Sequence, residues 1–255
     1  MSETFSVADK VVVITGAGQG IGRAFAKSFA SAGAHVVIAE RNVEKAHAVA
    51  QEIAAGNGHA TVVETDVADA ESVAALGASV DRQFGRADVL INNAAIFSTL
   101  EMRPFDQIPL PEWEQVLRVN VTGPFLCARA MLPLMRRNKF GRIINMASGA
   151  VTLGRPNYLH YIASKAALEG MTHSMARELG ADGITVNAVL PGATYTEIAR
   201  KTVTPEQKER IVAMQCVPRP QIPDDLVGVV LFLASDASAF MTGQSLNVDG
   251  GATHR

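Results

Sequence analysis

Cysteine is nearly absent from this sequence, and aromatic residues are scarce. Of its 255 residues, two are cysteine and one is tryptophan, and aromatic side chains contribute 5%. Cys127 and Cys216 do not form a CxxC pattern, which argues against a zinc site and against a disulfide framework. We expect two buried free thiols in a reducing compartment, and therefore a cytoplasmic protein.

The sequence also lacks an excess of charge of either sign and any long hydrophobic run. Lys and Arg number 23 and Asp and Glu number 25, giving a formal net charge of -2. Without a basic patch to release phosphate counterions, we expect no nucleic-acid partner. No apolar run approaches the roughly 18 residues of a membrane span, and the first ten residues do not resemble a secretory signal.

What the sequence does contain is an alternation of buried strands and helices. Hydrophobic residues make up 48% of the chain, and continuous β-branched runs predict strands covered on both faces. We expect a single-domain α/β fold over 1–255, a Rossmann-like doubly wound sheet of seven mainly parallel strands with helices on both faces. The predicted strands are 10–15, 35–40, 60–65, 87–92, 142–147, 184–190 and 245–248, and predicted helices include 23–32, 43–55, 70–84, 113–135 and 157–180.

One long segment interrupts this alternation. Residues 192–223 include Pro205, Pro218, Pro220 and Pro223, which predicts an irregular insertion after a buried strand. Such insertions often cover an active site, so we expect a substrate lid at about 192–223. A surface loop without a function is the alternative.

A glycine-rich turn follows the first predicted strand. The sequence TGAGQGIG places Gly16, Gly18, Gly20 and Gly22 directly between a strand and a helix. Glycine permits positive φ and lets a phosphate approach main-chain N–H groups, and the helix N-terminus adds a favourable dipole. We therefore expect Gly16, Gln19, Gly20 and Ile21 to bind a dinucleotide. Tight packing of strand and helix is the alternative reason for the glycines.

The end of the second predicted strand indicates which dinucleotide is bound. Glu40 stands where folds of this kind hold the adenosine ribose, and its carboxylate would repel a 2′-phosphate. This favours NAD over NADP. Arg41 acts in the opposite direction, because a guanidinium can pair with a 2′-phosphate, while Gln19 adds no positive charge.

Polar residues follow the third and fourth predicted strands. Asp66 and Val67 come after the third, and Asn92 and Asn93 after the fourth. Ligands of parallel sheets bind at these carboxyl ends. We expect Asp66, Val67 and Asn93 to contact the cofactor or to brace the neighbouring loops.

The pair of Tyr161 and Lys165 carries the predicted chemistry. In YIASK they are spaced i and i+4, so on a helix they share a face. A tyrosine has a pKa of about 10, and lowering it by about two units requires roughly 3 kcal/mol, which a nearby ammonium can supply. Ser148, which follows the fifth predicted strand, could orient a carbonyl or alcohol oxygen. Each feature alone is common, but together they predict one site.

Asn120 and Pro124 lie in the predicted helix 113–135. Pro124 has no N–H, so the carbonyl of Asn120 loses its helical partner and must bind water or another donor. A simple kink of the helix is the alternative outcome.

Taken together, these motifs resemble those of the short-chain dehydrogenase/reductase family over essentially the whole chain. TGAGQGIG, NNAA, Asn120, Ser148, YIASK, Pro191-Gly192 and MTGQSLNVDGG occur in family order. The resemblance implies that Tyr161 is the general acid/base, Ser148 orients substrate, Lys165 binds the nicotinamide ribose and Asn120 holds a water of the proton relay. It also implies that Pro191, Gly192, Thr194 and Thr196 pack on the nicotinamide and its phosphates. NNAA for the commoner NNAG, and Thr194 for the usual Ile, are departures near the cofactor.

The resemblance implies an NAD-dependent enzyme that acts on a secondary alcohol or ketone, and a homotetramer. Apolar residues and few fixed charges in 149–159 and 193–214 favour a neutral, partly apolar substrate. A sugar dehydrogenase, a 3-oxoacyl reductase and a non-catalytic nucleotide-binding module remain alternatives. An epimerase or dehydratase would need an added substrate domain. No metal site is predicted.

Overall fold

A computed structural model describes residues 3–199 and 204–254, and its core is one parallel β-sheet. Over these residues seven strands run in the order β3-β2-β1-β4-β5-β6-β7, and every neighbouring pair is parallel. The strand order reverses between β1 and β4, the position at which doubly wound sheets bind ligands. The predicted fold class is confirmed. The strands are β1 (Val11–Thr15), β2 (His35–Glu40), β3 (His59–Glu64), β4 (Val89–Asn92), β5 (Gly141–Met146), β6 (Ile184–Pro191) and β7 (Ser245–Val248).

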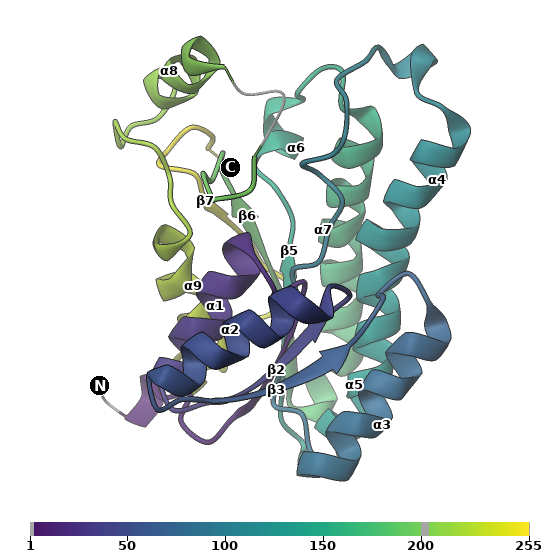
Figure 1. The fold of residues 1–255 in the computed structure, drawn as a ribbon, viewed down its shortest axis with the longest axis vertical. Helices are drawn as coiled ribbons and strands as arrows, with labels where there is room; N and C mark the ends of the chain where they lie inside the picture. The colour runs from purple at the N-terminus through teal and green to yellow at the C-terminus, as the bar shows by residue number, and fades with distance from the viewer. Residues whose placement is uncertain (1–2, 200–203, 255) are drawn as a thin grey trace.

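Three long helices cover each face of the sheet (Figure 1). Helices α1 (Gly20–Ser31), α2 (Val43–Ala55) and α9 (Asp224–Ala234) pack on one face. Helices α3 (Ala70–Phe84), α5 (Gly123–Asn138) and α7 (Leu159–Leu179) pack on the other. The shorter α4 (Leu110–Leu117), α6 (Ala150–Leu153) and α8 (Pro205–Ala213) lie apart from one another at the same end of the molecule (Figure 1).

Burial separates the inner strands from the edge strands. All residues of β1, β4, β5 and β6 are buried, as continuous apolar strands predict. The edge strands β3 and β7 are only partly covered, so the expectation of two covered faces is wrong for them. The predicted bounds 35–40 and 245–248 match β2 and β7, and those of the other strands differ by one or two residues, because hydrogen bonding rather than hydropathy ends a strand.

The predicted helix 113–135 is not continuous. Helix α4 ends at Leu117, a π-helical turn spans Arg118–Thr122, and α5 begins at Gly123. Pro124 cannot donate to the carbonyl four residues earlier, and the Gly123 N–H donates instead to the carbonyl of Arg118. The proline therefore changes the helical register at Asn120, which is fully buried.

The segment 192–223 is less irregular than predicted, since it contains α8. The Thr204 hydroxyl accepts a hydrogen bond from the Gln207 N–H, the Gln207 side-chain oxygen accepts one from the Thr204 N–H, and Pro205 starts the helix. This capping box explains why a proline-rich segment forms a helix here.

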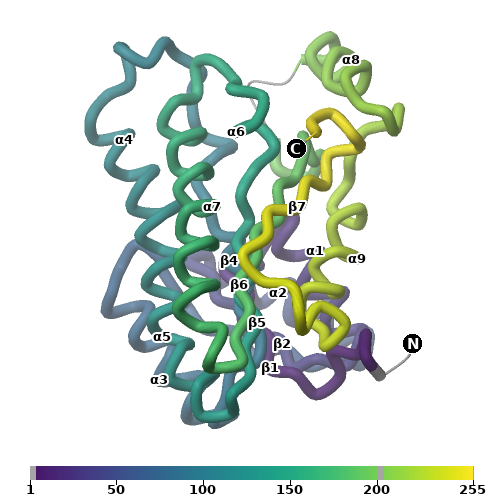
Figure 2. Tube along the Cα trace, turned by 180° about the vertical axis from the view of Figure 1, so that it is seen from behind, coloured from purple at the N-terminus to yellow at the C-terminus, as the bar shows by residue number. Residues whose placement is uncertain are grey.

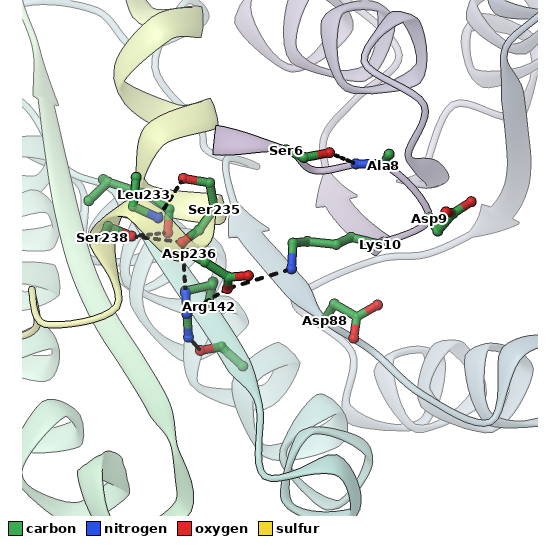
Figure 3. Close-up of polar contacts among 12 residues, drawn as sticks. Ser6, Ala8, Asp9, Lys10, Asp88, Arg142, Leu233, Ser235, Asp236 and Ser238 are labelled. Atoms are coloured by element: carbon green, nitrogen blue, oxygen red, sulfur yellow. Dashed lines mark hydrogen bonds and ion pairs between the residues drawn. The ribbon is translucent and has the colours of Figure 1, made fainter. Parts of the chain in front are cut away.

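A partly buried polar cluster joins the sheet to the C-terminal part of the chain at the amino ends of the strands (Figure 3). Arg142 in β5 donates to the Ser235 carbonyl and pairs with Asp236 at 3.3 Å, and Lys10 approaches the same carboxylate at 3.8 Å. Burial lowers the pKa of Arg142, and Asp236 partly offsets this. The cluster lies at the amino ends of the strands, whereas ligands of parallel sheets bind at the carboxyl ends, so its role is structural. Seen from behind, the chain after α9 runs along β6 as β7 (Figure 2).

The two thiols have different surroundings. Cys127 in α5 is buried, and burial raises its pKa to about 12. Cys216, which follows α8, is exposed. The expectation of two buried thiols is therefore wrong for Cys216. In the part of the chain that the structure describes, no helix has both the length and the apolar character needed to cross a membrane.

Candidate active site

A cleft of about 740 Å³ opens at the carboxyl ends of the central strands. Of the predicted site residues, the structure places fourteen on its wall: Gly16, Gln19, Ile21, Glu40, Asp66, Val67, Asn93, Ser148, Tyr161, Lys165, Pro191, Gly192, Thr194 and Thr196. Gly20 and Asn120 are not part of the wall, although both contact residues beside it. Each of the seven strands in the described part of the chain, or the turn after it, contributes to the wall, so the parallel strand ends bring distant residues together.

The glycine-rich turn forms a tight backbone cradle. Gly16 has φ +65°, and a Cβ there would lie 2.8 Å from the Ala94 Cα. The Asn93 amide donates to the carbonyls of Thr15 (2.9 Å) and Gly16 (3.1 Å), and the Thr15 hydroxyl accepts from the N–H groups of Asn93 and Ala94. Asn93 thus braces the turn, which keeps its backbone close to the cleft. This cradle fits a phosphate-bearing cofactor. The bracing by Thr15 was not predicted.

An anion already contacts the start of α1. The Gly20 N–H donates to Oε1 of Glu197 at 2.8 Å. A Cβ on Gly20 would lie 2.8 Å from Cδ1 of Ile198, so the segment 196–198 lies directly over the turn. No local sequence pattern indicates this contact, because the two residues are separated by most of the chain.

Glu40 is fixed at the end of β2. Its Oε2 accepts from the Gly18 N–H at 3.1 Å, and its Oε1 accepts from the Asn42 N–H at 2.9 Å. Arg41 has a side chain 74% exposed and approaches Asp66 at 3.9 Å. The Asp66 carboxylate also accepts from the Ala68 N–H, so it braces its loop. A second cation, Lys45, contacts the Gln19 side chain.

Tyr161, Lys165 and Ser148 lie together in the middle of the cleft wall. Tyr161 and Lys165 are on one face of α7, with the ammonium nitrogen 5.8 Å from the centre of the tyrosine ring. The Lys165 Nζ donates to the Met146 carbonyl at 2.7 Å, and burial lowers its pKa to about 8. The Ser148 hydroxyl accepts from the Ala150 N–H at 3.2 Å. The site therefore combines a phenol, a desolvated ammonium and a nearby hydroxyl, which is a proton-transfer arrangement.

The Asn120 side chain is connected to the backbone of Tyr161 through Ser164. Its Oδ1 accepts from the Ile96 N–H at 2.8 Å, and its Nδ2 donates to the Ile96 carbonyl and, at 3.0 Å, to the Ser164 hydroxyl. Ser164 in turn donates to the Tyr161 carbonyl at 2.7 Å. These bonds connect the π-helical turn to the helix that carries Tyr161. The role of Ser164 was missed, since a serine inside a helix carries no distinct signal.

The two ends of the segment 192–223 are tied to β7. The Gly192 N–H and the Gln221 amide both donate to the Val248 carbonyl, at 3.0 and 2.6 Å. The buried Thr194 hydroxyl donates to Oε1 of Gln221 at 3.1 Å. The unusual Thr194 is thus part of the connection between the two ends of this segment.

The outer end of the cleft is aromatic and carries two cations. The rings of Phe97 and Tyr161 lie 4.6 Å apart, and Tyr158 meets Tyr161 edge-on at 6.3 Å. Arg155, after α6, and Arg210, in α8, both contribute to the wall. These two arginines differ from the expectation of few fixed charges in 149–159 and 193–214.

The family model described as Enoyl-(Acyl carrier protein) reductase matches residues 16–253. The chain is a short-chain dehydrogenase/reductase. Enzymes of this family bind nicotinamide cofactors and act as oxidoreductases, which agrees with the resemblance seen in the sequence.

Relatives of this short-chain dehydrogenase/reductase act on different substrates. It is 40% identical over 245 residues to a 3-oxoacyl-[acyl-carrier-protein] reductase of Synechocystis sp., covering 95% of this chain and 96% of the relative. A gluconate 5-dehydrogenase from Burkholderia cenocepacia, solved with NADP and tartrate, has 34% identity, a TM-score of 0.92 and coverage of 98% and 97%. A 7 alpha-hydroxysteroid dehydrogenase complexed with NADH and 7-oxo glycochenodeoxycholic acid has 32% identity, a TM-score of 0.94 and coverage of 100% and 98%.

Proposed function

We propose that this enzyme transfers a hydride between NAD(H) and a secondary alcohol or ketone. The observation that carries the proposal is the placement of Tyr161, Lys165 and Ser148 in the same cleft as the glycine-rich cradle. The names of the relatives support it, because they are dehydrogenases and reductases of hydroxyl and carbonyl groups. A non-catalytic nucleotide-binding module would have no use for this set of three.

The proposed roles follow from the chemistry of each group. In the direction of oxidation, the Tyr161 phenolate takes the proton of the substrate hydroxyl as the carbon–hydrogen bond breaks and the carbonyl forms. The nicotinamide, when bound, supplies the acceptor for the hydride. Lys165 favours the phenolate electrostatically, and Ser148 donates a hydrogen bond to the substrate oxygen. Asn120 would hold a water that connects Lys165 to solvent; Gly16, Gly20, Ile21, Pro191, Gly192 and Thr196 would contact the cofactor.

Preference for NAD rests on the contrast between Glu40 and Arg41. Glu40 is held by two backbone N–H groups, whereas Arg41 extends into solvent. A fixed carboxylate can accept from both ribose hydroxyls and repels a 2′-phosphate, while the exposed arginine must be ordered at an entropic cost. Relatives solved with NADP and with NADH support neither choice by themselves.

Three further expectations stay predictions: the lid at 192–223, the homotetramer and the cytoplasmic location. A sugar dehydrogenase or a 3-oxoacyl reductase remains the alternative activity, and the relatives include a galactose dehydrogenase and a 3-oxoacyl reductase by name.

The proposal is tested with Tyr161→Phe, which keeps the ring and removes the hydroxyl. We expect nicotinamide absorbance to show turnover of a panel of secondary alcohols and ketones by the wild type and almost none by the variant. Calorimetry should show cofactor binding by both proteins. A variant that keeps a tenth of the wild-type kcat would remove Tyr161 from the role of general acid/base.

A further inference from the structure

Arg155 lies at the outer end of the cleft, beside the proposed reaction centre. It follows α6, is half-buried and lines the cleft. Its guanidinium carbon lies 4.9 Å from the centre of the Tyr158 ring, and Nη2 lies 3.9 Å from the Met102 sulfur. Tyr158 is fully buried and meets the Tyr161 ring edge-on. Arg155 is therefore held against a rigid aromatic surface that leads directly to the catalytic tyrosine.

No carboxylate among residues 3–199 and 204–254 forms an ion pair with Arg155. A nearby arginine shows the contrast: Arg103 pairs with Glu101 at 2.8 Å and approaches Glu112 at 3.8 Å. A guanidinium is always charged and its planar fork matches a carboxylate, so a half-buried one without a counter-ion is available for an anionic ligand.

The carboxylates on the cleft wall do not supply that counter-ion. Glu40 and Asp66 belong to the glycine-rich end, where backbone N–H groups hold them. Asp249 accepts from the Gly251 N–H and from both the N–H and the hydroxyl of Thr253. Each of these carboxylates therefore accepts hydrogen bonds from backbone N–H groups and forms no ion pair with Arg155 among the described residues.

Helix α8 contributes another arginine to the cleft wall. Arg210 in α8 lines the cleft, is exposed, and has no ion pair within the described ranges. Figure 1 shows α6 and α8 at the same end of the molecule, on separate parts of the chain. Two arginines from different parts of the chain therefore line the same cleft, and apolar side chains line it with them: Phe97, Leu153, Ile211 and Met214.

From this arrangement we infer that the substrate is a hydroxy acid or oxo acid whose carboxylate binds Arg155 while its alcohol or ketone faces Tyr161. An apolar carbon chain between the two groups fits the apolar wall. The inference rests on the proposed oxidoreductase function and replaces the neutral substrate that the sequence favoured. Charge-assisted hydrogen bonds of this kind change affinity by about ten- to a hundredfold.

The experiment compares oxo acids with their methyl esters, which keep the shape and lose the charge. The probes are 3-oxobutanoate, 4-oxopentanoate and 5-oxohexanoate, each with its methyl ester, reduced with NADH. We expect at least one acid to exceed its ester in kcat/KM by ten- to a hundredfold. Arg155→Met, which keeps a long side chain over Tyr158, should abolish that preference mainly through KM.

Two further variants make the result specific. Arg155→Lys keeps the charge without the fork and should restore part of the preference. Arg82→Gln removes an exposed arginine of α3, far from the opening, and should leave the preference unchanged. Turnover of the methyl ester by Arg155→Met, whatever its rate, shows that this variant is folded.

The outcomes separate this inference from the proposed function. If the esters are reduced but no acid is preferred, or if Arg155→Met keeps the preference, the carboxylate assignment is overturned and the oxidoreductase function stands. If neither acids, esters nor neutral alcohols and ketones are turned over, the proposed function itself fails.

Discussion

The buried ammonium of Lys165 makes the stability of the fold depend on pH. Burial lowers its pKa to about 8 from an ordinary value of 10.5. Between these two values the unfolded chain binds a proton that the folded protein has lost, so the free energy of unfolding must rise with pH. Below about pH 8 both states are protonated, and the cost of burying the charge is constant.

The size of the effect follows from the two pKa values. The full difference corresponds to about 3 kcal/mol, of which about 2 kcal/mol falls between pH 7.5 and 9.5. Cys127 acts in the opposite direction, because its pKa is raised by burial and the unfolded thiol ionises first. A comparison of variants that all retain Cys127 cancels that contribution.

The assay is urea unfolding of Tyr161→Phe and of Tyr161→Phe/Lys165→Met, so that titration of the phenol does not contribute. We expect the free energy of unfolding of the first protein to gain about 2 kcal/mol relative to the second between pH 7.5 and 9.5. Equal pH dependence in the two proteins would show that Lys165 is not desolvated in the fold. A slope of the opposite sign would show that its pKa is raised, which would refute the reasoning.

The remaining predictions concern the cofactor and the assembly. In wild type, kcat/KM should be higher with NAD than with NADP. Glu40→Ser should shift the ratio of the two kcat/KM values toward NADP by about ten- to a hundredfold, since the Arg41 charge is then no longer opposed by a carboxylate. An unchanged ratio would show that Glu40 does not select the cofactor. Light scattering at micromolar concentration should give a tetramer, because Phe125 and Leu159 on α5 and α7 are 49% and 43% exposed and need a covering layer; a monomer would contradict this.

The fold could be predicted from sequence because each strand carries its own signal. A run such as Val11–Thr15 is continuously apolar and is followed by glycines, and such a pattern specifies a buried parallel strand without knowledge of its partners. A disturbance of the helix at Pro124 could be predicted, since the missing N–H is a local property of proline. The π-helical turn that accommodates the proline could not be predicted. The edge positions of β3 and β7 depend on sheet order, which local sequence does not give.

The candidate site was predictable where one short segment contains the chemistry. Tyr161 and Lys165 share a helix face, and the glycines of the first turn are adjacent in sequence. Contacts such as Glu197 with Gly20 and Asn120 with Ser164 join residues from different elements, so only the folded chain shows them. The same holds for Arg155, because its lack of an ion pair among residues 3–199 and 204–254 is a property of its surroundings.

Glu197 contacts the start of α1, so a cofactor phosphate that binds the Gly20 N–H, as we propose, exchanges with an anion of the protein. The Gly20 N–H is occupied by the protein's own carboxylate, and a phosphate that used this donor would have to displace it, since two negative groups repel each other there. The free energy of nucleotide binding at this donor is then the difference between two terms: the gain from the phosphate contact and the loss of the Glu197 contact. By thermodynamic reciprocity, whatever holds segment 196–198 against the turn weakens nucleotide binding by the same factor by which the nucleotide loosens the segment.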